Sequence, residues 1–142
     1  MLKHIPKIIT PQILDAMMKT GHGEELLICD GNYPSLSARG EKIYTPCGDI
    51  AELLKAVLYF FPLDYASEYA AVVMESCREG EAFGKYTQLI EENKSKLECA
   101  ERFAFYKRAE NAVYIIVTAD TTKGGNILLK KGVVKDADLP KL

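Results

Sequence analysis

The most constraining feature of this sequence is a set of short, almost continuous apolar runs separated by longer amphipathic segments. The runs cover residues 26–29, 70–74, 112–118 and 126–129 and are rich in leucine, isoleucine and valine. A strand that is apolar at nearly every position is buried on both faces, which is typical of a parallel sheet covered by helices. We therefore expect an α/β fold, a layered α/β/α domain with a largely parallel central sheet.

Helix signals precede the first run and occur in the longer segments between the runs. Thr10 is a good N-cap ahead of Pro11, and residues 49–52 match a capping box. Helical spacing of apolar residues predicts further helices over 83–96 and 101–111, and we expect a short strand around 42–44. The 142 residues suit one domain over 1–142, in which 135–142 form a weakly ordered tail.

The composition argues against several classes of partner. The formal net charge is -2 and lysine and arginine are not clustered, so nucleic acid and anionic membrane surfaces are not expected partners. No stretch approaches the ~18 apolar residues of a membrane span, and the first six residues lack the apolar core of a signal peptide. The four cysteines are scattered without a C-x-x-C pair, which argues against a zinc site or a disulfide framework and favours a reducing cytoplasm.

His22 is the first candidate for chemistry. It lies between Gly21 and Gly23, and the only other histidine, His4, is in the N-terminal arm. The flanking glycines give backbone freedom and leave room for another molecule to approach, and imidazole both accepts and donates a proton near neutral pH. The alternative is a helix-terminal histidine that interacts with the last carbonyl groups of the preceding helix.

Polar residues lie at the ends of two predicted strands. Asp30 follows the first strand, and Gly124, Gly125 and Asn126 lie at the start of the last one. Open α/β sheets bind ligands at the carboxyl ends of their strands; alternatively, Asp30 forms an Asp-Gly turn and the two glycines form a hairpin turn. The sequence contains no phosphate loop, nucleophile elbow or metal-binding helix motif. What remains suits proton transfer on a neutral polar molecule, without a metal or organic cofactor.

Several segments together resemble the RbsD/FucU family, the D-ribose pyranases and L-fucose mutarotases. They are MLK (1–3), ITP (9–11), GHGE (21–24), DGNYP (30–34), RFAFY (102–106) and GNILLKKGV (125–133). No single motif is highly specific, but their order and spacing are, and they extend over nearly the whole chain. The segments RFAFY and GNILLKKGV indicate the fucose branch of the family.

The resemblance implies an isomerase, an L-fucose mutarotase that interconverts the α and β anomers by acid/base catalysis and needs no cofactor. It also implies a cytoplasmic protein, monosaccharide ligands and a homo-oligomer, usually a decameric ring with sugar sites where subunits meet. Ribose pyranase activity, which interconverts furanose and pyranose forms, is one alternative. A non-catalytic sugar-binding protein is the other.

The resemblance also assigns roles to individual residues. His22 matches the proton-transfer histidine, Asp30 and Arg102 match sugar-contacting residues, and Asn126 matches the asparagine before the last strand. Two positions depart from the family pattern, since Asn32 replaces a histidine of the fucose branch and Gly124 replaces a tyrosine. Both departures bear on the choice of sugar. The sequence leaves open whether Tyr33, Tyr106 or a backbone group compensates for that tyrosine.

Spacing along the first strand separates His22 from Asp30. If residues 24–30 form a straight strand, six steps of ~3.3 Å place the two residues about 20 Å or more apart. Two arrangements would bring them to one sugar: a shorter strand with His22 folded back, or a site to which two subunits contribute. The second predicts that activity depends on assembly.

Overall fold

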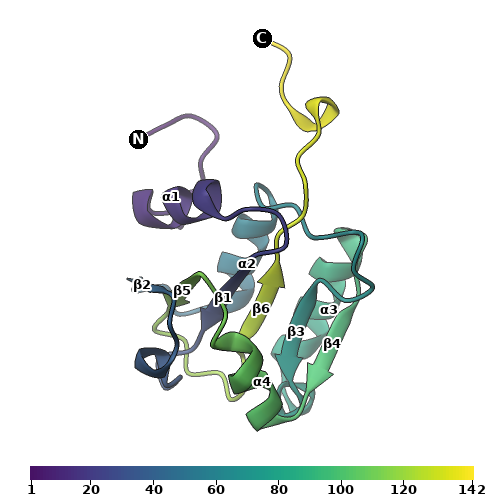
Figure 1. Ribbon diagram of the computed structural model, residues 1–142. Coiled ribbons are helices and arrows are strands. Elements are labelled where there is room, and N and C mark those ends of the chain that lie inside the picture. Colours follow the sequence, from purple (N-terminus) through teal and green to yellow (C-terminus); the bar gives the residue numbers. More distant parts are fainter.

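The computed structural model describes residues 1–142 and contains a six-stranded sheet with the order β2-β5-β1-β6-β3-β4 (Figure 1). The strands are β1 (Glu25–Cys29), β2 (Glu41–Tyr44), β3 (Ala71–Met74), β4 (Leu97–Ala100), β5 (Tyr114–Val117) and β6 (Ile127–Lys130). β6 is antiparallel to its neighbours β1 and β3, and the other three pairings are parallel. The expected α/β fold with a largely parallel sheet is confirmed.

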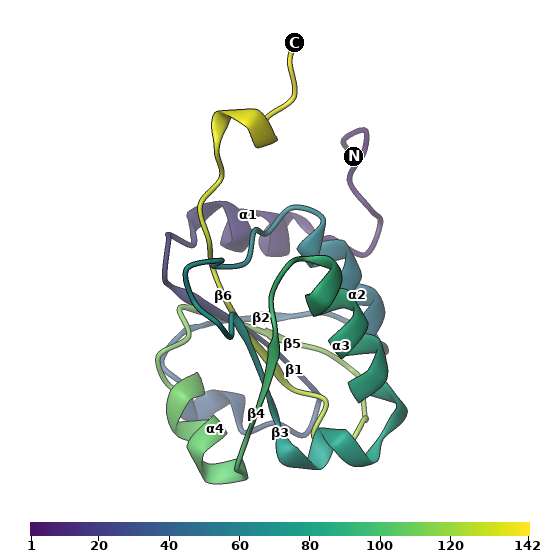
Figure 2. The ribbon, with the colours of Figure 1, turned by 90° about the vertical axis from the view of Figure 1, so that its right-hand side faces the viewer.

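Helices cover both faces of the sheet. α1 (Pro11–Lys19), α2 (Ile50–Leu58) and α3 (Glu81–Glu92) pack on one face, and α4 (Arg102–Ala109) packs on the other. Figure 2 shows α2 and α3 on the opposite side of the sheet from α4. Three 3-10 turns complete the fold: η1 (Ser35–Ser37), η2 (Glu75–Glu79) and η3 (Asp136–Asp138). None of the helices is both long and apolar enough to cross a membrane.

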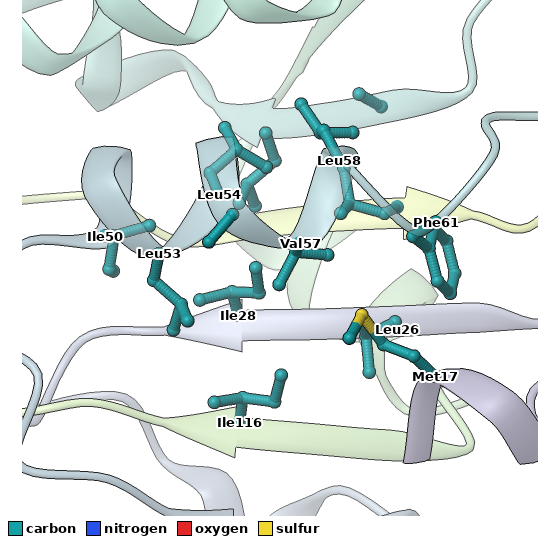
Figure 3. Packing of buried hydrophobic residues seen from close by; sticks show 14 of the residues in the cluster. Met17, Leu26, Ile28, Ile50, Leu53, Leu54, Val57, Leu58, Phe61 and Ile116 are labelled. Carbon is teal, nitrogen blue, oxygen red and sulfur yellow. The ribbon is translucent and has the colours of Figure 1, made fainter. Parts of the chain in front are cut away.

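The two-residue period of the strands divides the core between these faces. In β1, Leu26 and Ile28 join a cluster of 24 buried residues, and Leu27 joins the cluster of 12 on the α4 side. Figure 3 shows Leu53 and Val57 of α2 above β1 in the larger cluster. Each fully buried leucine or isoleucine contributes about 1.5–3 kcal/mol, which explains why the runs are apolar at nearly every position.

Both predicted N-caps are present, but the Glu52 side chain does not accept a hydrogen bond from Asp49 N, so the predicted capping box is only half formed. The Thr10 hydroxyl accepts a hydrogen bond from Ile13 N at 3.3 Å, and Oδ1 of Asp49 accepts from Ala51 N and Glu52 N at 2.8 and 3.2 Å. These bonds satisfy amide groups that have no partner within the helix. Local sequence therefore determines where α1 and α2 begin.

The predicted helix over 83–96 is wrong at both ends. α3 begins at Glu81 and ends at Glu92, and Lys94, with a φ of 59°, has a left-handed conformation that does not continue the helix. β4 (Leu97–Ala100) then forms the sheet edge and was not predicted. All four β4 residues are only half-buried, so this strand has no continuous apolar run.

Candidate active site

His22 lies in a β-turn between α1 and β1. Glu24 N donates to Gly21 O at 3.1 Å, and Gly23, at the third position of the turn, has a φ of +81°. A positive φ there is typical of a type II turn and favours glycine. Gly23 N also donates to Lys131 O at 2.8 Å, which attaches the turn to the segment after β6. The amide and hydroxyl of Thr20 close the end of α1, so His22 is not the helix cap.

The turn directs the His22 imidazole toward Asp64. Nε2 of His22 lies 3.6 Å from Oδ1 of Asp64, and the imidazole is 57% exposed whereas the Asp64 side chain is 7% exposed. Oδ1 of Asp64 accepts from Ala66 N and Oδ2 accepts from the Ser67 hydroxyl, at 3.1 and 2.8 Å. The Ser67 hydroxyl contributes most to a lowered pKa of the Asp64 carboxyl, and the opposing effect of burial is outweighed by further donors and by Lys130.

Asp64 cannot be recognised as a site residue from the sequence. It lies shortly after Pro62, in the segment that follows α2, and nothing in the local pattern distinguishes it from other loop aspartates. Pairing Nε2 with a carboxylate would favour a proton on that nitrogen and leave Nδ1 as the basic one. Asp64 is thus suited to orient the imidazole and to stabilise its protonated form.

A polar cavity of about 710 Å³ lies at the opposite end of the sheet. The carboxyl ends of β1, β3 and β4 and the amino end of antiparallel β6 meet there, as expected for an open α/β sheet. Four carboxylates and two cationic side chains are among its lining residues, which are Asp30, Asn32, Tyr33, Met74, Glu75, Ser76, Glu79, Glu101, Arg102, Tyr106, Thr121, Thr122, Lys123, Gly124 and Asn126.

Asp30 and Asn126 form the buried base of this cavity. The amide N–H of Asp30 donates to Oδ1 of Asn126 at 2.8 Å, so the amide NH₂ of Asn126 is available to a ligand. Oδ1 of Asp30 accepts from Asn32 N at 2.8 Å, which confirms the predicted turn around Asp30 and fixes the carboxylate. Asp30 and Asn126 are 6% and 3% exposed and still line the cavity, so both offer polar groups from a rigid position.

Arg102 and aromatic rings form one wall of the cavity. Nε of Arg102 donates to the Tyr106 hydroxyl at 3.2 Å, and the guanidinium carbon lies 5.6 Å from the Tyr106 ring centroid. Tyr106 packs edge-to-face on Tyr33, with the two ring centroids 5.5 Å apart. The buried residues of α4 are Phe105 and Ala109, and Phe103 is 69% exposed.

Gly124 and Gly125 do not form a hairpin turn, because β1 lies between β5 and β6 in the sheet. Gly124 has a φ of +67° and lines the cavity. Gly125 is buried behind it, and its carbonyl accepts a hydrogen bond from the fully buried Tyr86 hydroxyl at 2.8 Å. Gly125 thus contributes to loop position, and it is not among the residues that line the cavity.

His22 and the cavity lie at opposite ends of β1 within one chain. The four residue steps from Glu25 to Cys29 span about 13 Å at ~3.3 Å each, and His22 and Asp30 lie beyond these ends. The structure therefore does not fold His22 back toward Asp30. The predicted site residues Asp30, Arg102, Gly124 and Asn126 are brought together, and His22 is not.

Comparison with known proteins decides the family. The family model described as the "RbsD / FucU transport protein family" matches residues 3–134. This chain belongs to the RbsD/FucU family. Among its RbsD/FucU relatives, the fucose mutarotase of Bos taurus is 38% identical, with 97% of each chain covered, and that of Danio rerio is 37% identical, with 94% of each covered.

Solved structures of family members have the same fold. The fucose mutarotase of Streptococcus pneumoniae, in complex with L-fucose, superposes with a TM-score of 0.86 at 37% identity, covering 94% of this chain and 100% of that one. Bacillus subtilis RbsD, complexed with D-ribose, gives a TM-score of 0.78 at 16% identity, covering 95% and 100%, a likeness of fold alone.

Proposed function

We propose that this RbsD/FucU protein is an L-fucose mutarotase, an isomerase that interconverts the α and β anomers of the free sugar. The observation that carries the proposal is the cavity in which Asp30, Arg102 and Asn126 meet, in a chain 37% identical to a mutarotase that binds L-fucose. Charged and amide groups around an aromatic wall suit a ligand with many hydroxyl groups and one apolar face.

The chemistry needs two proton transfers. A base removes the proton of the anomeric hydroxyl, an acid protonates the ring oxygen, and the bond between the anomeric carbon and the ring oxygen breaks to give the open aldehyde. Rotation of the aldehyde group presents the other face of its carbonyl to the former ring oxygen, and the reverse proton transfers close the ring. We assign proton transfer to His22, directly or through water, because an imidazole beside the Asp64 carboxylate can accept and return a proton.

The other predicted residues hold the sugar. Asp30 and Asn126 would bind hydroxyl groups at the base of the cavity, and Arg102 would bind another hydroxyl from the wall. The Tyr106 ring beside Arg102 would cover an apolar sugar face. The backbone at Gly124 would form part of the cavity wall. Gly125 lies behind this wall, where its hydrogen bond from Tyr86 would hold the loop in position.

A complete site would then combine two copies of the chain. One copy would supply His22 and Asp64, and a neighbouring copy would supply the cavity. We propose a homo-oligomer, a decameric ring, with sugar sites where subunits meet.

The remaining expectations follow the same proposal. The chain would act as one domain over 1–142, with 135–142 as a tail outside the 3–134 region that matches the family. Four free cysteines support a reducing, cytoplasmic location. The reaction needs no metal or organic cofactor, because proton transfer to and from oxygen is within reach of side chains.

Saturation-transfer NMR on the anomeric protons of L-fucose tests the proposal. We expect the exchange rate between anomers to rise in proportion to protein concentration. Parallel measurements with D-ribose and D-galactose distinguish fucose mutarotation from pyranase-type or broader activity. If the protein binds L-fucose but does not change the exchange rate between anomers, it is a non-catalytic sugar-binding protein and the proposed mutarotase activity is refuted.

A further inference from the structure

We propose that the Ser76 hydroxyl binds a hydroxyl group of the sugar and that Gly124 is the residue that makes room for it. The inference rests on the proposed function, because it concerns the ligand of the same cavity.

Ser76 has a free polar group in the right place. It lies in η2, two residues after the carboxyl end of β3, where it is half-buried and lines the cavity. The hydroxyls of Ser67 and Ser95 are engaged by Asp64 and by Ala70 N, respectively. No hydrogen bond within the chain uses the hydroxyl of Ser76, so it remains available to a ligand.

Gly124 leaves the space that this hydroxyl occupies. A Cβ added at Gly124 would overlap Oγ of Ser76 and lie 3.1 Å from Cys77 N, and the φ of +67° disfavours other residues. Glycine at 124 lets the loop approach η2 this closely while the Ser76 hydroxyl keeps its position. Any larger residue would displace the Ser76 hydroxyl from the cavity wall.

The position of Ser76 fits a sugar ligand. The Asn126 amide is two residues from Gly124 on the same loop, and the Asp30 carboxylate lies beside Asn126. Asp30 can only accept and the free NH₂ of Asn126 can only donate, whereas a serine hydroxyl does both, like the sugar hydroxyl it would meet. Ser76 therefore adds a contact that neither of the other two side chains can make.

The substitution Ser76→Ala tests this role in the full chain. We expect Kd and KM for L-fucose to rise roughly 2- to 10-fold, as for loss of one neutral hydrogen bond, with kcat and melting temperature almost unchanged. Ser37→Ala is the matched control, since Ser37 is exposed in η1 and does not line the cavity. Gly124→Ala should weaken binding in the wild type and have a smaller further effect in the Ser76→Ala background.

A series of monodeoxy-L-fucose analogues then identifies the contact. For one analogue, which lacks the hydroxyl bound by Ser76, wild type and Ser76→Ala should bind equally. Unchanged L-fucose binding by Ser76→Ala, or the same loss for every analogue, would overturn the inference. Failure of the wild type to bind L-fucose would instead contradict the proposed function and this inference together.

Discussion

Nε2 of His22 lies 3.6 Å from Oδ1 of Asp64, so an exposed imidazole on a glycine turn meets a buried and firmly held carboxylate. Ser67 and Ala66 donate to that carboxylate and keep its pKa below the usual range, with Ser67 as the main cause. Asp64 therefore stays ionised at neutral pH. A charge fixed on one side of the imidazole stabilises the protonated ring that proton transfer would produce.

Replacing His22 tests whether this imidazole transfers the proton. We expect His22→Ala to lower kcat/KM for L-fucose by about 10²- to 10⁴-fold, the usual contribution of a positioned acid/base, measured as anomer exchange by NMR. His4→Asn, which changes the only other histidine, should leave exchange unchanged. Exchange by His22→Ala at the wild-type rate would contradict the assignment.

Asp64 is expected to act through His22, as a positioning residue. Asp64→Asn keeps the size of the side chain and removes its charge, so we expect kcat to fall at least about 10-fold with little change in KM. Asp15→Asn, which removes an exposed carboxylate of α1, is the control. A rise in KM with unchanged kcat would show that Asp64 binds substrate instead.

The separation of His22 from the cavity predicts complementation between subunits. His22→Ala and Asp30→Ala chains should each be inactive alone. After dissociation and reassembly at equal amounts, about one quarter of wild-type activity should return, because random pairing in a head-to-tail interface leaves that share of sites intact. Each variant taken through reassembly alone is the control. Absence of activity at every mixing ratio would refute a shared site.

Asp120 links the loop after β5 to the start of α2, and its charge should support stability. Its carboxylate accepts from Ile50 N and Thr122 N, both at 2.7 Å. Burial by itself would raise the pKa of Asp120, but these hydrogen bonds outweigh it and lower the pKa. The charged form therefore stabilises the fold above the pKa of the unfolded chain, about 3.9, and this contribution is lost as pH falls through the lower folded value.

Asp120→Asn should accordingly reduce the free energy of unfolding by about 1–3 kcal/mol at pH 7. The difference from wild type should shrink as pH is lowered toward 3, because protonation removes the same charge from the wild type. Urea denaturation across pH measures both effects. A difference that stays constant down to pH 3 would mean that packing, not charge, accounts for the loss.

Substitution by alanine should have opposite effects on stability at two of the glycines. At Gly23, with a φ of +81° and open space around an added Cβ, alanine should destabilise by about 1–2 kcal/mol through backbone strain alone. At Gly84, in the interior of α3 and also with open space, alanine should stabilise by about 1 kcal/mol. Thermal melts of both variants measure the contrast. Equal effects would contradict a type II turn at His22.

Local patterns were sufficient for most of the fold. The apolar runs predicted β1, β3, β5 and β6, and the caps at Thr10 and Asp49 predicted where two helices begin. They were insufficient for β4, because its four residues are only half-buried and form no continuous apolar run. They were also insufficient for Asp64, whose environment comes from residues distant in the sequence.

The sequence by itself determined the layered α/β architecture, the glycine turn that carries His22 and the polar turn at Asp30. These depend on short-range periodicity and on backbone preferences of single residues. Only the tertiary structure decided that β6 runs antiparallel between β1 and β3, which joins Asn126 to Asp30 across 96 positions. It also decided that His22 and the cavity lie at opposite ends of β1, since strand order results from burying whole apolar faces and not from any local signal.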